Sequence, residues 1–221
     1  VVVGSGNITL KKSSDNSTVQ AMPVGGANVS VSGAVVTINP TANLDSSQGY
    51  YVQIAAAAFD DASGNSYAGI SDTTSLNFTA ADVAGPTLSS SSPADNATGV
   101  AGNANIVLTF NENVVLGSGN ISLYKTNGTL VEAMSVSSAA VTASTNTVTI
   151  NPTANLDSLQ GYYILIDATA IDDASGNSYA GIGSSSLLNF TSADLSAPTL
   201  TSSSPADNAI GVAIGSNITL T

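Results

Sequence analysis

Two short acidic turns hold the side chains of this sequence that could bind a metal ion. Residues 61–65 and 173–177 both read Asp-Ala-Ser-Gly-Asn, which places a carboxylate, a glycine and a side-chain amide within one turn. Calcium prefers oxygen-rich turns of this kind, so the pattern predicts a calcium site in each. Neighbouring aspartates could add ligands, and the full set of candidates is Asp60, Asp61, Asn65, Asp82, Asp172, Asp173, Asn177 and Asp194.

The same two turns also have a structural interpretation. Asp and Asn side chains stabilise tight turns by bonding to nearby backbone groups, and glycine adopts the positive φ that such turns need. The spacing of the acidic residues is not that of an EF-hand loop. The sequence therefore leaves calcium binding and simple turn formation as alternatives.

Catalysis is not expected from this set of residues. The chain has no Cys and no His, which excludes a cysteine nucleophile, a Ser-His-Asp triad and zinc held by histidine or thiolate. Asp60 and Asp61 are adjacent at a predicted strand end, so their side chains point apart and do not form the carboxylate pair of a glycosidase. We expect a protein that is not an enzyme.

The charge balance limits the kinds of partner. Only 8% of the 221 residues are charged, and 15 acidic residues against three basic ones give a net charge of -12. Nucleic acid and anionic lipid are therefore unfavourable partners. No apolar run in this segment approaches the length of a membrane span. The acidic, cysteine-free composition is typical of an exported bacterial protein.

An internal repeat organises the chain. The eleven residues from Asp60 to Ile70 return unchanged from Asp172 to Ile182, an offset of 112 residues. A period of this length corresponds to a whole small domain and predicts a tandem array of separately folded domains. We predict an incomplete repeat over residues 1–85 that lacks its first strands, a complete repeat over 86–197, and the opening strands of a further repeat over 198–221.

Each repeat reads as a series of short strands. Apolar and polar residues alternate with a period of two, and the longest strand is predicted from Tyr50 to Phe59. Seven or eight strands separated by turn residues predict an all-β fold with a β-sandwich in each repeat. In the complete repeat we predict strands near residues 87–91, 105–110, 120–126, 130–136, 140–143, 147–151, 161–171 and 187–191.

Tyrosines mark the start of the longest strand in both copies. Tyr50 and Tyr162 resemble a tyrosine corner, in which the hydroxyl bonds back to the preceding loop. Tyr51 and Tyr163 point to the other face, where they could form a platform for a sugar or simply pack against neighbours. A bound glycan is therefore a possible partner.

The two ends of the sequence are cut at matching points of the repeat. The chain begins at the equivalent of Val114 and stops at the equivalent of Thr109. Either these residues are a window from a longer array of near-identical repeats, or each tail supplies the missing first strands of the next subunit. The residues that would donate a strand are Ser216, Asn217, Ile218, Thr219, Leu220 and Thr221.

Several segments of the complete repeat carry a family resemblance, and they are residues 86–88, 91–100, 106–114, 156–163, 173–177 and 188–191. They resemble the bacterial Ig-like domains first described in S-layer proteins and found in giant adhesins. The resemblance implies tandem Ig-like β-sandwiches of about 112 residues, a bacterial cell-surface or extracellular location, and calcium near the joints between repeats. It is specific for fold and says little about activity.

Repeats and composition together predict a structural function. We expect an extender segment of a repetitive cell-surface or extracellular fibre, whose partners are neighbouring repeats or identical subunits in a filament. The alternative is a calcium-dependent adhesin module that binds a glycan or host protein through loops at one end of the sandwich.

Overall fold

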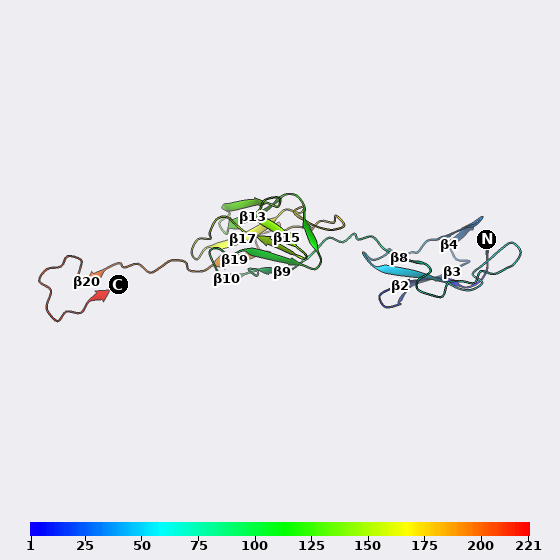
Figure 1. Cartoon of the computed structure of the whole chain (residues 1–221), viewed down its shortest axis with the longest axis horizontal. Helices are drawn as coiled ribbons and strands as arrows, with labels where there is room; N and C mark the ends of the chain where they lie inside the picture. Colours follow the sequence, from blue (N-terminus) through cyan, green and yellow to red (C-terminus); the bar gives the residue numbers. More distant parts are fainter. The chain divides into compact units, whose positions relative to one another are not determined.

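The computed structural model describes residues 1–221, and every regular element in it is a β-strand. The chain forms two compact units, Val1–Gly85 and Pro86–Thr221, and Figure 1 labels several strands of each. No helix is present that could cross a membrane. The all-β class predicted from the alternation of residues is therefore confirmed.

The second unit contains a complete sandwich of two sheets. Its strands are β9 (Leu88–Ser92), β10 (Ala97–Val100), β11 (Ile106–Phe110), β12 (Val114–Leu116), β13 (Asn120–Lys125), β14 (Leu130–Ser135), β15 (Val141–Ser144), β16 (Thr147–Ile150), β17 (Gly161–Ile166), β18 (Ile171–Asp173) and β19 (Asn189–Ser192). One sheet has the order β10-β19-β17-β13-β14 and the other β15-β16-β11-β9, and β12 pairs with β18. Strands β10 and β19 run parallel, whereas the other pairs are antiparallel.

Alternating side chains build the core between these two sheets. Strands β11 and β17 bury every second residue, because successive side chains of a strand point to opposite faces. The buried residues of the two strands belong to one apolar cluster, and they are Ile106, Leu108, Phe110, Tyr162, Ile164 and Ile166. Removal of this apolar surface from water is the main stabilising contribution to the sandwich.

The predicted tyrosine corner is present in both units. The Tyr162 hydroxyl accepts a hydrogen bond of 2.7 Å from the backbone N–H of Asp157, and Tyr50 accepts one of 2.8 Å from Asp45. Each aspartate also forms an ion pair with a lysine, the second unit using Lys125 at 2.6 Å. The corner therefore fixes the loop that precedes the central strand.

The first unit repeats the second from β12 onward. Its strands are β1 (Val2–Val3), β2 (Asn7–Lys12), β3 (Thr18–Pro23), β4 (Val29–Ser32), β5 (Val35–Ile38), β6 (Gly49–Ile54), β7 (Phe59–Asp60) and β8 (Asn77–Thr79). They form a sheet with the order β3-β2-β6-β8 and the pairs β4-β5 and β1-β7. Residues 1–85 contain no counterparts of β9, β10 and β11, so β5 and β8 each have an open edge.

The predicted long strand from Tyr50 to Phe59 is wrong in its length. Strand β6 ends at Ile54, Ala57 adopts a φ of 63° in the left-handed region, and β7 begins only at Phe59. The chain leaves the sheet there because Gly4 and Ser5 donate backbone hydrogen bonds to Ala58 and Ala57. The second copy has the same break between β17 and β18.

The tail after Pro198 forms a small pair of strands, β20 (Ser203–Ser204) and β21 (Thr219–Leu220). Ser203 lies opposite Leu220, which is the register that Ser91 and Leu108 have in the complete sandwich. The large apolar side chains of the tail are exposed, and they are Leu200, Ile210, Val212, Ile214, Ile218 and Leu220.

A matched pair of substitutions measures what the missing strands contribute. Leu188 is 1% exposed and its counterpart Leu76 is 39% exposed. We expect Leu188→Ala to lower the free energy of unfolding of the second unit by about 2 to 5 kcal/mol, because it leaves a cavity in a closed core. Leu76→Ala should cost the first unit less than about 1 kcal/mol, because water already reaches that site. Calorimetric unfolding of the dilute chain checks both values, and equal costs would contradict the difference in packing.

Candidate functional site

The acidic turns satisfy their own polar groups. The Asp61 Oδ1 atom accepts hydrogen bonds of 2.8 Å from the backbone N–H groups of Ser63 and Asn65, and its Oδ2 atom accepts one of 2.8 Å from the Asn65 side chain. Asp173 has the same three contacts with Ser175 and Asn177. This geometry accounts for the conserved spacing of the two copies as a turn that is closed by its aspartate.

The same hydrogen bonds keep these carboxylates ionised. Burial by itself raises the pKa of Asp173, which is only 3% exposed, but the bonds donated by Asn177 and Ser175 outweigh it and hold the pKa below its ordinary value. The pKa of Asp61 is also lowered, first by the side chain of Asn65 and then by its backbone amide. Both turns therefore carry a negative charge at neutral pH.

The adjacent aspartates lie on short strands rather than in the turns. Asp60 ends β7 and Asp172 lies in β18. The Asp172 Oδ1 atom accepts a hydrogen bond of 2.6 Å from the Ser178 hydroxyl, whereas the Oδ1 atom of Asp60 is buried without a hydrogen-bond partner. The predicted ligands thus occupy several hydrogen-bonding environments, and calcium binding stays a prediction.

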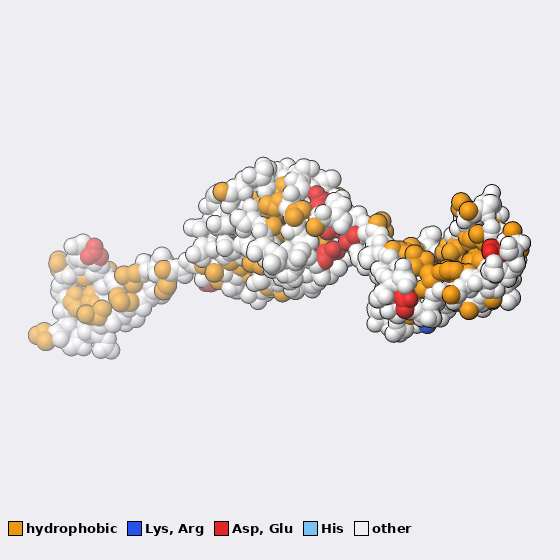
Figure 2. All heavy atoms as spheres, turned by 45° about the vertical axis from the view of Figure 1, so that its right-hand side comes forward, with side chains coloured by type: hydrophobic (Ala, Val, Ile, Leu, Met, Phe, Trp, Pro, Cys, Tyr) orange, Lys and Arg blue, Asp and Glu red, His pale blue; other side chains and the backbone are white.

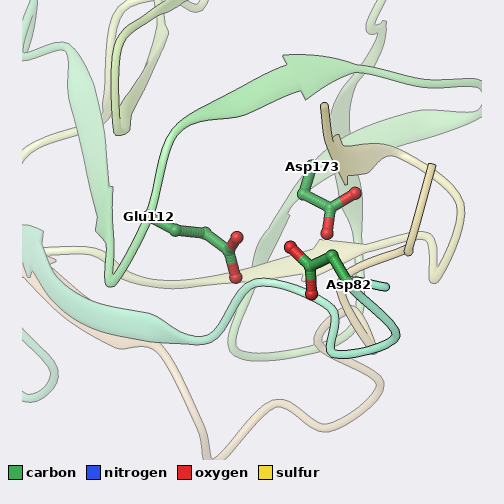
Figure 3. Close-up of side chains that lie close together, drawn as sticks. All are labelled: Asp82, Glu112 and Asp173. Atoms are coloured by element: carbon green, nitrogen blue, oxygen red, sulfur yellow. The ribbon is translucent and has the colours of Figure 1, made fainter. Parts of the chain in front are cut away.

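Glu112 is an acidic residue near the Asp173 turn that the sequence did not single out. It follows β11, and one of its carboxylate oxygens lies within 4.8 Å of a carboxylate oxygen of Asp173 (Figure 3). Two negative charges at this separation repel each other, and a cation beside them would relieve the repulsion. Glu112 therefore joins the candidate ligands, and only the folded chain brings it to the turn.

A second recurring device fixes the chain where it leaves each unit. The Ser158 hydroxyl donates a hydrogen bond of 2.9 Å to Asp194 and accepts one of 2.8 Å from the backbone N–H of Leu195. Ser46 makes the same contacts in the first unit, with Asp82 at 2.8 Å. We call this arrangement the exit latch. It joins the linker after β8 or β19 to the loop before β6 or β17, so Asp82 and Asp194 already have a structural role.

The exit latch also sets the charge state of its aspartate. Hydrogen bonds from the backbone N–H of Ser196 and from the Ser158 hydroxyl lower the pKa of Asp194. Sequence reasoning proposed Asp194 as a metal ligand and missed Ser158. The repeat of Asp-Ser at 45–46 and 157–158 was the available signal, but serine is too common in this chain to draw attention.

The first unit exposes side chains that the second unit buries. The missing strands β9 to β11 explain the difference, because Phe110 of β11 packs edge-on against Tyr179 with ring centroids 5.2 Å apart. The exposed fractions at matching positions are 38% for Leu44 and 7% for Leu156, 43% for Tyr67 and 9% for Tyr179, and 40% for Phe78 and 3% for Phe190.

These exposed residues line a hollow along the first unit, seen in Figure 2 as a band of hydrophobic side chains. Two adjoining pockets make up this hollow. Their volumes are about 450 and 570 Å³, and Ile38 lines both. We call the two together the open groove. Its apolar lining includes Leu10, Met22, Val36, Ile38, Leu76 and Phe78. An exposed apolar surface of this kind is unusual on a folded domain and is typical of surfaces that another molecule or segment covers.

The predicted donor residues lie at the end of the tail. Thr219 and Leu220 form β21, and the N–H of Ser216 donates to the carbonyl of Ala213 in the turn before it. Ile218 is 79% exposed. The donor segment is therefore already extended and presents apolar side chains, while strand donation itself stays a prediction.

Two facing sheets with a tyrosine corner define the second unit as an Ig-like β-sandwich. A family model described as a bacterial Ig-like domain matches residues 2–80 and 82–192, and the chain belongs to this family with two copies in tandem. The predicted family is thereby confirmed, whereas the narrower likeness to S-layer proteins and giant adhesins stays a prediction.

The chain is also similar to a solved structure, the crystal structure of CopC from Methylosinus trichosporium OB3b. The match covers 52% of this chain and 99% of that chain, at 15% sequence identity and a TM-score of 0.34. No curated protein matches the chain.

Removal of the turn carboxylate tests its structural role. We expect Asp173→Ala to lower the melting temperature of the second unit at pH 7, because three hydrogen bonds are lost. The pKa of Asp173 is lower in the folded chain than in the unfolded chain, so its contribution is present above the ordinary aspartate pKa and is lost as the pH falls below about 4. The difference between the wild-type and variant melting temperatures should therefore shrink at acidic pH.

Asp61→Ala is the matched control for this substitution. Asp61 has the same bonds but is exposed, so its removal should lower the melting temperature of the first unit less. The structural role of Asp173 would be contradicted if the variant melted like wild type in the presence of EDTA and differed from it only after calcium was added.

Proposed function

We propose that this chain is a structural extender segment of a repetitive bacterial cell-surface or extracellular fibre, and that its subunits join by strand donation. The exit latch carries the proposal, because it recurs with the same atoms in both units. A protein that transmits tension needs each module to hold its own linker in the same way. Substrate binding or catalysis would not require this repetition.

The latch lies where tension enters a unit. A pull on the linker after β19 first loads the hydrogen bonds between Ser158, Asp194 and Leu195. It then loads β19, which is held between β17 and β10 on both edges. Many backbone hydrogen bonds must break together in this geometry, so the sandwich resists the pull. Prolines at 86 and 198 follow the linkers and limit their bending.

The surface composition supports the proposed extracellular location. A net charge of -12 with few charged groups and no Cys suits a soluble spacer that neither sticks to anionic surfaces nor needs a particular redox environment. The calcium-dependent adhesin is less well supported, because the oxygens of Asp61 and Asp173 are already engaged by their own turns. Titration with calcium and a screen of glycans test that alternative.

Stretching the whole chain between its termini tests the extender function. We expect the second unit to unfold in one cooperative step that releases at most roughly 40 nm, the extended length of one repeat. Ser158→Ala should raise its unfolding rate at constant force by roughly fivefold, because the latch loses the serine hydroxyl. Single-molecule force spectroscopy measures both.

Ser196→Ala is the matched control. It lies in the same linker, its backbone N–H still bonds to Asp194, and the first unit has Ala84 at this position. This variant should unfold at the wild-type rate. Gradual extension without a step, or equal rates for the two serine variants, would contradict a latch that resists tension.

A further inference from the structure

We propose that the open groove is filled by residues 199–221 of a second copy of this chain, which replace the counterparts of β9, β10 and β11. This inference rests on the proposed fibre function and identifies its joint. The proposed joint has a defined register, because the complete sandwich of the second unit shows how the same segment packs.

The tail matches the strands that the first unit lacks. Residues 199–221 and 87–109 share most of their sequence, including Ser-Ser-Ser-Pro-Ala-Asp-Asn-Ala at 202–209 and 90–97. Strands β20 and β21 already pair in the register of β9 and β11. The tail is thus formed as a strand pair before it meets a partner, which lowers the entropy that must be lost on binding.

One side of the tail fits the open edge of β5. In the complete sandwich, Ile106 lies opposite Ile150 and Leu108 opposite Val148, and all four are at most 2% exposed. The equivalent pairs are Ile218 with Ile38 and Leu220 with Val36. Both side chains of the tail are exposed in this chain, and both residues of β5 line the open groove. Docking would therefore bury apolar surface on both partners.

The other side of the tail fits the open edge of β8. In the complete sandwich, the Asp95 Oδ1 atom accepts hydrogen bonds from the backbone N–H of Asn189 at 3.0 Å and from its side-chain amide at 2.9 Å. The first unit has Asn77 at the position of Asn189, and the tail has Asp207 at the position of Asp95. In the proposed joint, Asp207 of the tail would therefore accept the same two hydrogen bonds from Asn77 of β8.

One difference between the copies favours the first unit as the site for this tail. A Cβ atom on Gly102 would lie 2.7 Å from the Cδ1 atom of Leu195. The tail has Ile214 in place of Gly102, and the first unit has the shorter Val83 in place of Leu195. The larger tail residue is thus matched by a smaller residue in the linker after β8.

The order of segments along the chain indicates a second copy rather than the same one. Residues 86–110 follow the latch of the first unit, and their strands β9, β10 and β11 belong to the second unit rather than to the first. The tail follows the latch of the second unit, so by the same order it builds a unit that comes after it. The open groove of its own chain precedes the tail in the sequence, so the same order does not place the tail there. The open groove of a second copy is free of this restriction.

Cysteine pairs in this cysteine-free chain test the register. Val107 lies opposite Thr149 in the complete sandwich, which places Thr219 opposite Thr37 in the proposed joint. A mixture of Thr37→Cys chains and Thr219→Cys chains should give a disulfide-linked heterodimer under mild oxidation. The double variant should give a ladder of oligomers whose yield rises with concentration. Non-reducing gel electrophoresis resolves both.

Two controls make the outcome specific. Thr221→Cys in place of Thr219→Cys shifts the thiol by two residues on the same face and should give little heterodimer. Leu220→Asp should reduce the heterodimer at least about tenfold, since its counterpart is fully buried. Ile210→Asp changes another exposed apolar residue of the tail, whose counterpart Thr98 is exposed in the complete sandwich, and should leave the yield unchanged.

Three results would overturn the proposal. The double variant could form only an internally linked monomer at every concentration, which would show that the tail folds onto its own chain. The two register positions could cross-link equally, or the two aspartate variants could act alike, which would show unspecific contact. These readouts are independent of mechanical strength, so a chain that fails the stretching test can still form the joint, and the reverse.

Discussion

The constraint on which this structure depends is that a sheet with one apolar face must have that face covered. In the second unit β9 and β11 cover it from the opposite sheet, and β10 closes the edge of β19. In the first unit the same apolar residues are present without that cover, and the groove is the direct result. Covering this surface would remove apolar side chains from water and so stabilise residues 1–85.

The local polar devices do not depend on the missing strands. The tyrosine corner, the lysine–aspartate pair, the acidic turn and the exit latch recur in both units with nearly the same distances. They fix loops within the part of the repeat that the first unit retains. The first unit is therefore organised locally, and what it lacks is a strand-bearing segment of the kind that residues 199–221 contain. A longer array and exchange between subunits would both cover the groove with a segment of this kind.

The sequence predicted the repeat, the all-β class and the tyrosine corner because each depends on local spacing or on comparison of the two copies. It misplaced the end of β6, since the alanines at 55–58 carry no alternation that could locate a break. It did not find Ser158 or Glu112 as partners of Asp194 and the Asp173 turn, because those contacts join residues far apart in the chain. Comparison of burial at equivalent positions, such as Phe78 and Phe190, required the folded structure.

Hydrogen exchange of the backbone amides in β5 tests most directly whether the open groove takes up a strand from a second copy. The matching strand β16 is already paired on both edges and is the internal control. Protection of residues 35–38 should rise with protein concentration, while protection of residues 147–150 stays constant. Exchange in β5 that is equally fast at every concentration would contradict the account.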